Sequence, residues 1–249
     1  MLVFPSYIKI FLLPIYYLFH KNIIFGLIQK KIIKKFCYKN LEFLIITNYL
    51  STSNYSSFFF KTYEYNDRKL IEKNINELNK CVIVGGGIGF IPAIAYYKSK
   101  NKIIVFEIDK RIKKNLLINL KKNKCHYNIY DKNLVFKKKN KTSFFYLDKN
   151  FLNNSIYRIT SKKIQVSNIH YKKIKNFQKF NTLIIDAEGI EEYFIKNLQY
   201  LKNINHLFFE LHYDLFDKDK ISNLKNILKK NKFKLIDQCF NSFYYKRFI

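Results

Sequence analysis

Three scarcities in the sequence narrow the classes of protein that it fits. Only four of the 46 basic residues are arginine, and arginine forks are the usual means by which proteins read nucleic-acid bases. The four cysteines stand far apart and form no Cys-x-x-Cys pair, and no histidine lies at zinc-ligand spacing. A zinc site or a disulfide framework is therefore disfavoured, and a reducing, cytoplasmic location is expected.

Long apolar runs are the third scarcity. Residues 10–19 are almost wholly apolar, but Lys9, Pro14 and the break at residues 20–22 keep the clean run near ten residues, whereas a membrane-spanning helix needs about 20. No basic segment precedes the run and no small-residue cleavage site follows it, which disfavours a secretory signal.

Lysines follow this apolar segment, so residues 1–35 have two open interpretations. They lie peripherally on an anionic membrane, or they form an amphipathic helical cap that packs on the domain or on a dimer partner. We treat residues 1–40 as an N-terminal extension and residues 41–249 as the domain.

The formal net charge of +28 at first suggests a nucleic-acid or membrane partner. However, Lys, Asn, Ile, Phe and Tyr are all abundant and alanine occurs three times, which is the usage expected from A/T-rich codons. Genome composition therefore explains the lysine excess without a nucleic-acid surface, and nucleic acid is not the expected partner.

The most informative stretch lies between residues 81 and 107. An apolar run at residues 81–84 opens into a glycine-rich turn, a short helix follows, and a second apolar run ends in Glu107. This order predicts a strand, a tight turn, a helix and a parallel strand, with amides at the helix start that let a nucleoside-bearing ligand lie close. The turn carries four glycines in five positions: Gly85, Gly86, Gly87 and Gly89.

The spacing of these glycines separates two classes of cofactor. A dinucleotide-binding turn has the pattern G-x-G-x-x-G, but Phe90 stands where its third glycine should fall. The G-x-G-x-G present instead favours S-adenosylmethionine (SAM), with Glu107 accepting hydrogen bonds from both ribose hydroxyls. Asp131, at the end of the next predicted strand, is either an acid near the adenine or a simple turn residue.

The remaining patterns predict an α/β fold: a doubly wound, mostly parallel, Rossmann-like sheet of seven strands with a C-terminal antiparallel hairpin. Asp67 is expected to cap a helix that runs to about residue 78, and Asp109 to cap the helix after Glu107. Residues 132–169 are predicted as a hairpin-rich insertion with a short helix after it. Strands are expected at residues 41–46, 58–65, 81–84, 102–107, 127–130, 182–186, 206–212, 233–237 and 243–248.

Acids and a histidine follow the later core strands. Asp186 and Glu188 follow one strand, and Glu210 and His212 end the next. Because neighbouring parallel strands end at the same edge of a sheet, both pairs are predicted to meet beside the glycine turn. His212 is the candidate base for a substrate hydroxyl, and Asp186 or Glu188 would orient it or hold substrate hydroxyls.

Other interpretations of these residues stay open. Asp186 and Glu188 are also placed to cap the following helix, and His212 is equally suited to a structural role. The Asp, Glu and His group is also chemically able to bind a divalent cation, although we assign no metal to it.

Together these residues resemble the FkbM family of SAM-dependent methyltransferases, over about residues 55–240. Residues 186–191 (Asp-Ala-Glu-Gly-Ile-Glu) resemble the family's D-V-E-G-A-E, residues 210–212 resemble its E-I-H, and Tyr63-Glu64 resembles a tyrosine-glutamate pair before the first strand. The glycine turn departs from the family's D-x-G-A-N-x-G. Ile83 stands where the family pattern has an acid, and Gly87 stands where it has an asparagine. These replacements remove a polar contact to the methionine portion of SAM.

The resemblance implies methyl transfer from SAM to an oxygen, with a hydroxyl of a glycan, a lipid-linked sugar or a related small molecule as the expected acceptor. One alternative is an RNA methyltransferase that uses the lysine-rich surface. Another is a non-catalytic binding protein that kept the fold and lost the donor, for which Ile83 is the only hint. A dehydrogenase is disfavoured by Phe90.

Overall fold

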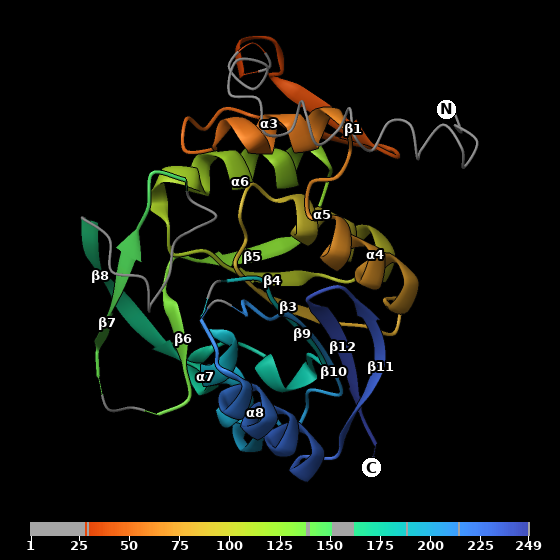
Figure 1. Ribbon diagram of the computed structural model, residues 1–249, viewed down its shortest axis with the longest axis vertical. Coiled ribbons are helices and arrows are strands. Elements are labelled where there is room, and N and C mark those ends of the chain that lie inside the picture. Colours follow the sequence, from red (N-terminus) through yellow and green to blue (C-terminus); the bar gives the residue numbers. More distant parts are fainter. Residues whose placement is uncertain are drawn as a thin grey trace.

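A seven-stranded sheet lies at the centre of the molecule (Figure 1), in a computed structural model that describes residues 28, 30–137, 140–150, 162–187, 189–213 and 215–248. The strands follow the order β11-β12-β10-β9-β3-β4-β5, and β12 runs antiparallel to both of its neighbours. The other pairs are parallel, which confirms the predicted doubly wound sheet with a C-terminal antiparallel hairpin. The strands are β3 (Cys81–Val84), β4 (Ile103–Phe106), β5 (Tyr127–Tyr130), β9 (Thr182–Ile185), β10 (His206–Glu210), β11 (Phe233–Cys239) and β12 (Ser242–Arg247).

Side chains of the central strands alternate between two cores. Ile83 and Val105 pack on one face of the sheet, Val82 and Ile104 pack on the other, and all four are fully buried. Helices α4, α5 and α6 cover the first face, and α7 and α8 cover the second (Figure 1). These helices are α4 (Tyr65–Asn74), α5 (Phe90–Ser99), α6 (Lys110–Lys122), α7 (Glu191–Lys196), which continues into a 3-10 turn (Leu198–Tyr200), and α8 (Lys218–Lys230).

The order of the strands reverses between β3 and β9. From β3 the chain adds β4 and β5 on one side, and it later returns to add β9 and β10 on the other side. In open α/β sheets, ligands bind outside the carboxyl ends of the strands at such a switch point. Gly85 follows β3 and Asp186 follows β9, so both residues lie at this position.

The strand predicted at residues 58–65 is wrong, because helix α3 (Thr52–Phe59) runs into this segment. Ser51 and Asn54 form a capping box in which each side chain accepts a hydrogen bond from the other residue's backbone amide. The polar residues that resemble a turn in the sequence therefore start a helix. The rings of Tyr55 and Phe58, three residues apart, are buried in the core.

The strand predicted at residues 41–46 is present as β2 (Leu41–Leu44), but it pairs with β1 (Lys35–Tyr38) outside the main sheet. A row of asparagine side chains on α6 and at its C-cap holds this hairpin by hydrogen bonds to the backbone of β2 and the residues after it. The domain boundary placed at residue 40 falls inside the hairpin. The asparagines are spaced four residues apart: Asn115, Asn119 and Asn123.

Helix α4 begins earlier than predicted. Its N-cap is Glu64, which has a left-handed backbone (φ 49°) and makes no side-chain capping hydrogen bond. Asp67 is therefore not the cap but lies in the first turn, where its side chain is buried. The helix ends at Asn74, short of the predicted residue 78.

The predicted insertion at residues 132–169 forms a separate three-stranded sheet in the order β6-β8-β7. Residues 151–161 of this insertion lie outside the described residues. The short helix predicted at residues 170–180 is present as two turns of 3-10 helix. The strands and turns are β6 (Asn133–Val135), β7 (Thr142–Leu147), β8 (Lys162–His170), η2 (Tyr171–Lys173) and η3 (Phe177–Lys179).

Within the described part of the chain, no helix combines the length and the apolar character that crossing a membrane requires. The membrane contact or helical cap predicted for residues 1–35 falls mostly on residues 1–27 and 29, which lie outside the described residues. From β1 onward the chain joins the domain, because Phe36 packs against the core.

Candidate active site

The glycine turn packs directly against the end of the neighbouring strand. Gly85, Gly87 and Gly89 have φ values of 92°, 51° and 92°. Residues other than glycine rarely adopt this backbone conformation. A Cβ atom on Gly85 would lie 1.8 Å from the carbonyl oxygen of Asp186, and one on Gly86 would lie 2.8 Å from side-chain atoms of α6 and β4. These glycines are therefore needed to bring the ends of β3, β4 and β9 together.

Glu107 closes this turn from the end of β4. Its Oε2 accepts hydrogen bonds from the amides of Gly86 (3.0 Å) and Gly87 (2.9 Å), and its Oε1 accepts one from the amide of Asp109 (2.8 Å). Burial raises the pKa of Glu107 to about 7, although the three amides favour the carboxylate. A carboxylate has about four lone-pair positions, of which these amides take three. The contact to a ribose stays a prediction.

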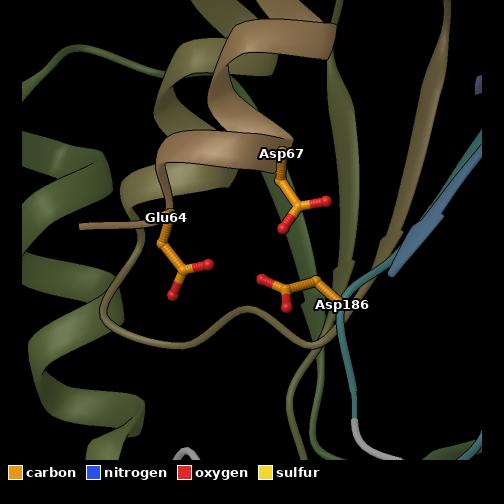
Figure 2. A group of neighbouring side chains, drawn as sticks. All are labelled: Glu64, Asp67 and Asp186. Carbon is orange, nitrogen blue, oxygen red and sulfur yellow. The ribbon is translucent and has the colours of Figure 1, made fainter. Parts of the chain in front are cut away.

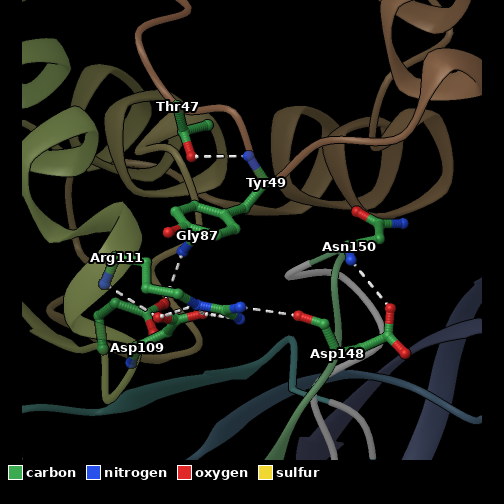
Figure 3. A network of polar contacts seen from close by, with 8 residues as sticks. Thr47, Tyr49, Gly87, Asp109, Arg111, Asp148 and Asn150 are labelled. Atoms are coloured by element: carbon green, nitrogen blue, oxygen red, sulfur yellow. Dashed lines mark hydrogen bonds and ion pairs between the residues drawn. The ribbon is translucent and has the colours of Figure 1, made fainter. Parts of the chain in front are cut away.

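Beside Glu107, the side chain of Arg111 joins three segments of the chain (Figure 3). Its Nε and Nη2 donate to the carboxylate of Asp109, its Nη1 donates to the carbonyl oxygen of Asp148 (2.8 Å), and its guanidinium lies 4.5 Å from the ring centroid of Tyr49. Asp109 also caps α6 by accepting from the Arg111 amide, as predicted. The loop after β4 is thereby fixed to the end of β7 and to the segment before α3.

Asp131 lies after β5, at the same edge of the sheet. Its carboxylate pairs with Lys113 Nζ of α6 at 3.0 Å, and this hydrogen-bonded partner lowers the pKa of Asp131. The structure thus gives Asp131 an ion-pair partner within the chain, and its predicted contact with an adenine stays a prediction.

Three carboxylates gather on the other side of the turn (Figure 2). Glu64 and Asp67 come from the start of α4, and Asp186 comes from the end of β9. One oxygen from each lies within 4.8 Å of the others. Asp67 is buried, whereas Glu64 and Asp186 are partly exposed. Of these three only Asp186 is a predicted site residue.

Burial and mutual repulsion make these carboxylates reluctant to ionise. Desolvation raises the pKa of Glu64 to about 7 and raises the pKa values of Asp67 and Asp186 well above the usual range, and the neighbouring acids add to each shift. The buried hydroxyl of Tyr63 lies among the same charges, so burial and the charges of Glu64 and Asp186 raise its pKa as well. A strongly negative potential therefore develops here when the acids ionise.

His212 follows β10 and contacts an acid that is not among the predicted site residues. Its Nδ1 lies 2.6 Å from Glu191 Oε1, at the start of α7, and its Nε2 lies 3.8 Å from Glu210 Oε2. Glu191 is fully buried, and this burial raises its pKa despite the favourable contact with His212. Glu210 also accepts a hydrogen bond from the side chain of Asn241.

The arrangement corrects two assignments. Among the described acids, Glu191 and not Asp186 is hydrogen-bonded to His212, whereas a contact of His212 with Glu188 stays a prediction. Asp186 does not cap the following helix either, because the N-cap of α7 is Ile190 and no side chain makes a capping hydrogen bond there. The strands that carry Asp186 and Glu210 are neighbours, as predicted. Glu188 lies outside the described residues.

The missed residues carried weak signals in the sequence. Glu64 belongs to the Tyr-Glu pair, and Glu191 is the last acid of the box at residues 186–191. The sequence does not show which residues either side chain contacts in the fold. Asp67 resembles a helix cap, because acids are common at that position.

No protein-family model and no curated protein matches this sequence. Among solved structures, a ribosomal protein L11 methylase from Lactobacillus delbrueckii subsp. bulgaricus is 13% identical, with a TM-score of 0.46 over 73% of this chain and 76% of that chain. TYW2 of P. horikoshii, in complex with MeSAdo, is 11% identical, with a TM-score of 0.45 over 85% of this chain and 68% of that chain.

A precorrin-6y C5,15-methyltransferase from Geobacter metallireducens GS-15 is 9% identical, with a TM-score of 0.43 over 72% of this chain and 83% of that chain. Similarity at this level carries no conclusion about activity. The function of this chain therefore has to be inferred from its own residues, which place a glycine turn, a buried acid and a histidine at the switch point of a doubly wound sheet.

Proposed function

We propose that this protein is a SAM-dependent methyltransferase of the FkbM type, which methylates a hydroxyl of a glycan, a lipid-linked sugar or a related small molecule. The observation that carries the proposal is the position of Glu107. Its buried carboxylate ends β4 and is held against the glycine turn, next to the point where the strand order reverses. This is the edge at which doubly wound sheets bind nucleoside ligands.

The chemistry of these residues fits SAM. A ribose diol offers two hydroxyl donors, and the carboxylate of Glu107, fixed in place by three amides, keeps about one lone-pair position to accept a hydrogen bond from the diol. Glu107 and the turn at residues 85–89 would hold the donor, which when bound supplies a methyl group on a sulfonium. Ile83 is fully buried in the apolar core and offers the donor no polar contact, so binding depends more strongly on Glu107.

His212 is the proposed base. In a neutral imidazole, the hydrogen bond from Nδ1 to Glu191 places the ring proton on Nδ1 and the lone pair on Nε2. Nε2 takes the proton of an acceptor hydroxyl, which thereby becomes a stronger nucleophile. Glu191 holds the ring in this orientation and stabilises the imidazolium that forms. Asp186 and Glu210 are proposed to hold further acceptor hydroxyls.

The chemistry of this edge favours a polyol over RNA as the acceptor. Sugar hydroxyls donate hydrogen bonds, and the acids of α4, β9 and β10 are acceptors when ionised. Any of these acids that ionises would repel the phosphates of an RNA backbone. The resemblance of residues 186–191 and 210–212 to the FkbM family supports the same choice.

The proposal is tested by calorimetric titration of the full chain with SAM and, separately, with NAD. We expect micromolar binding of SAM, no response to NAD, and binding at least about 10-fold weaker in Glu107→Gln, because the loss of one good charged hydrogen bond costs about 1.4 kcal/mol or more. Glu42→Gln is the matched control: Glu42 pairs with Lys122 at the surface and lies outside the site. Folding of each variant is checked by circular dichroism.

Transfer is then measured with SAM labelled in its methyl group, against sugars, lipid-linked sugars and RNA. If the folded wild-type protein does not bind SAM, the donor assignment is contradicted and the non-catalytic alternative is favoured. SAM binding with label appearing in RNA alone would contradict the acceptor assignment.

A further inference from the structure

The carboxylates of Glu64, Asp67 and Asp186 converge from two segments of the chain, and a positive charge on His212 lowers the pKa of Glu64 and of Asp67. Among the described residues, no lysine or arginine forms an ion pair with any of the three. The nearby Arg68 is directed elsewhere, because its Nη1 donates to the carbonyl oxygen of Lys61 and its guanidinium lies over the ring of Tyr38. Three acids so placed are costly when ionised, unless a cation joins them.

Two buried oxygens beside this cluster also lack partners. Ser242, fully buried at the start of β12, faces Asp67, whose pKa its hydroxyl lowers, yet its Oγ is not within hydrogen-bond geometry of any described atom. Oε2 of the fully buried Glu191 is likewise without a partner, and the charge of Glu191 acts on Asp186. Buried polar atoms are rarely left unpaired, and a bound ion or ordered water is a common reason for such atoms.

The separation of the three carboxylates suits a hard cation. Their oxygens lie within 4.8 Å of one another, and two ligands on opposite sides of Ca²⁺ are separated by about 4.8 Å, or by about 4.2 Å on Mg²⁺. The donor set contains oxygen only, with no thiolate or imidazole among the three, which favours Mg²⁺, Ca²⁺ or Mn²⁺ over zinc and copper.

We propose that Glu64, Asp67 and Asp186 bind one hard divalent cation at the start of α4. The site joins two segments that are far apart in the sequence, so the cation fixes the first turn of α4 to the carboxyl end of β9. Glu64 is held in a left-handed conformation at this junction, and cation binding stabilises it there. This binding does not require that the protein transfers methyl groups.

The test uses the full-length protein stripped with EDTA and titrated in separate arms with CaCl₂, MgCl₂ and MnCl₂. Calorimetry should show one cation bound per chain in at least one arm. Thermal unfolding should shift upward by about 5 °C or more when that cation is 100-fold above its Kd. Asp67→Asn should bind at least about 10-fold more weakly, since it removes the buried charged ligand.

Two comparisons separate loss of the site from loss of the fold. In EDTA, Asp67→Asn should unfold at the wild-type temperature or above it, because the substitution relieves repulsion among the three carboxylates. Glu42→Gln removes the same charge from a surface ion pair and should keep wild-type cation affinity. The proposal is overturned if none of the three cations binds the wild-type protein, or if Asp67→Asn binds as tightly as the wild type. A failure to bind SAM leaves this result unaffected.

Discussion

Buried acids are concentrated in one small region of a strongly basic protein. Five carboxyl groups among the described residues have raised pKa values, and all of them lie at the carboxyl edge of the central strands or at the start of the adjoining helices. Burial removes the water that would stabilise the charged form of each group. Such clusters are common at functional sites, where burial and neighbouring charges shift the pKa of each group to suit its function. The five are Glu64, Asp67, Glu107, Asp186 and Glu191.

Glu107 should make the stability of the fold depend on pH. Its pKa is raised from 4.5 to about 7 in the folded protein, so its contribution to stability is fully present below pH about 4.5 and is lost as the pH rises through about 7, by about 3 kcal/mol in total. Glu107→Gln cannot ionise and should lack this part of the decline. Urea unfolding of both proteins between pH 5 and 8 checks this, and parallel pH profiles would contradict it.

The contact between Glu191 and His212 should matter for rate more than for acceptor binding. Glu191→Gln keeps the size of the side chain but removes the charge that stabilises a protonated His212. If the protein transfers methyl groups as proposed, we expect kcat to fall by about 10-fold or more with little change in KM. This loss is smaller than the factor of about 10² to 10⁴ attributed to the general base itself, because Glu191 acts through His212.

The pH–rate profile separates this role from a structural one. Loss of a neighbouring negative charge lowers the pKa of a histidine, so the acidic limb of the profile should move to lower pH in Glu191→Gln. Rescue by Glu191→Asp would support the role, whereas an unchanged profile with a uniformly reduced kcat would indicate that Glu191 only maintains the fold.

At the level of elements, α6 supports both sides of the candidate site. Its N-terminus carries Arg111, which joins the loop after β4 to β7, and its inner face carries the asparagines that bind β2. The side chain of Asn119 makes three hydrogen bonds to the backbone. It accepts one from the amide of Leu44 and donates one each to the carbonyl oxygens of Leu44 and Ile88. The residue is fully buried, and its removal leaves the buried carbonyl group of Ile88 without this partner.

Asn119→Ala should therefore destabilise the protein by about 2–4 kcal/mol, since it leaves buried backbone groups unpaired. Lys114→Ala, at an exposed position of the same helix, should change stability by less than about 0.5 kcal/mol. The free energy of unfolding from urea titration checks both. Equal effects of the two substitutions would show that the asparagine row does not hold the hairpin.

Across the whole molecule, the reversal of strand order brings the two halves of the candidate site together. The first half of the sheet supplies the glycine turn and Glu107, and the second half supplies Asp186, Glu210 and the residues after them. β3 and β9 are adjacent, so the turn after one lies against the end of the other. The site therefore depends on the order of the strands more than on any single segment.

The sequence by itself determined the elements whose signals are local. Apolar runs buried on both faces specified β3, β4 and β9, the glycines specified the turn after β3, and Asp109 specified the start of α6, because each signal acts within a few residues. The start of α3 is local too, but its capping box resembles a polar turn when asparagine replaces the usual acid.

Only the tertiary structure decided which acids meet. Glu64 and Asp67 reach Asp186 because α4 packs against the sheet with its first turn at the carboxyl edge, and Glu191 reaches His212 because α7 begins beside β10. The position of a helix depends on how all the side chains between it and the sheet pack together. These side chains come from distant parts of the chain, so no short stretch of sequence predicts the position. The local pattern therefore located the edge where the site lies, and packing chose the residues that form it.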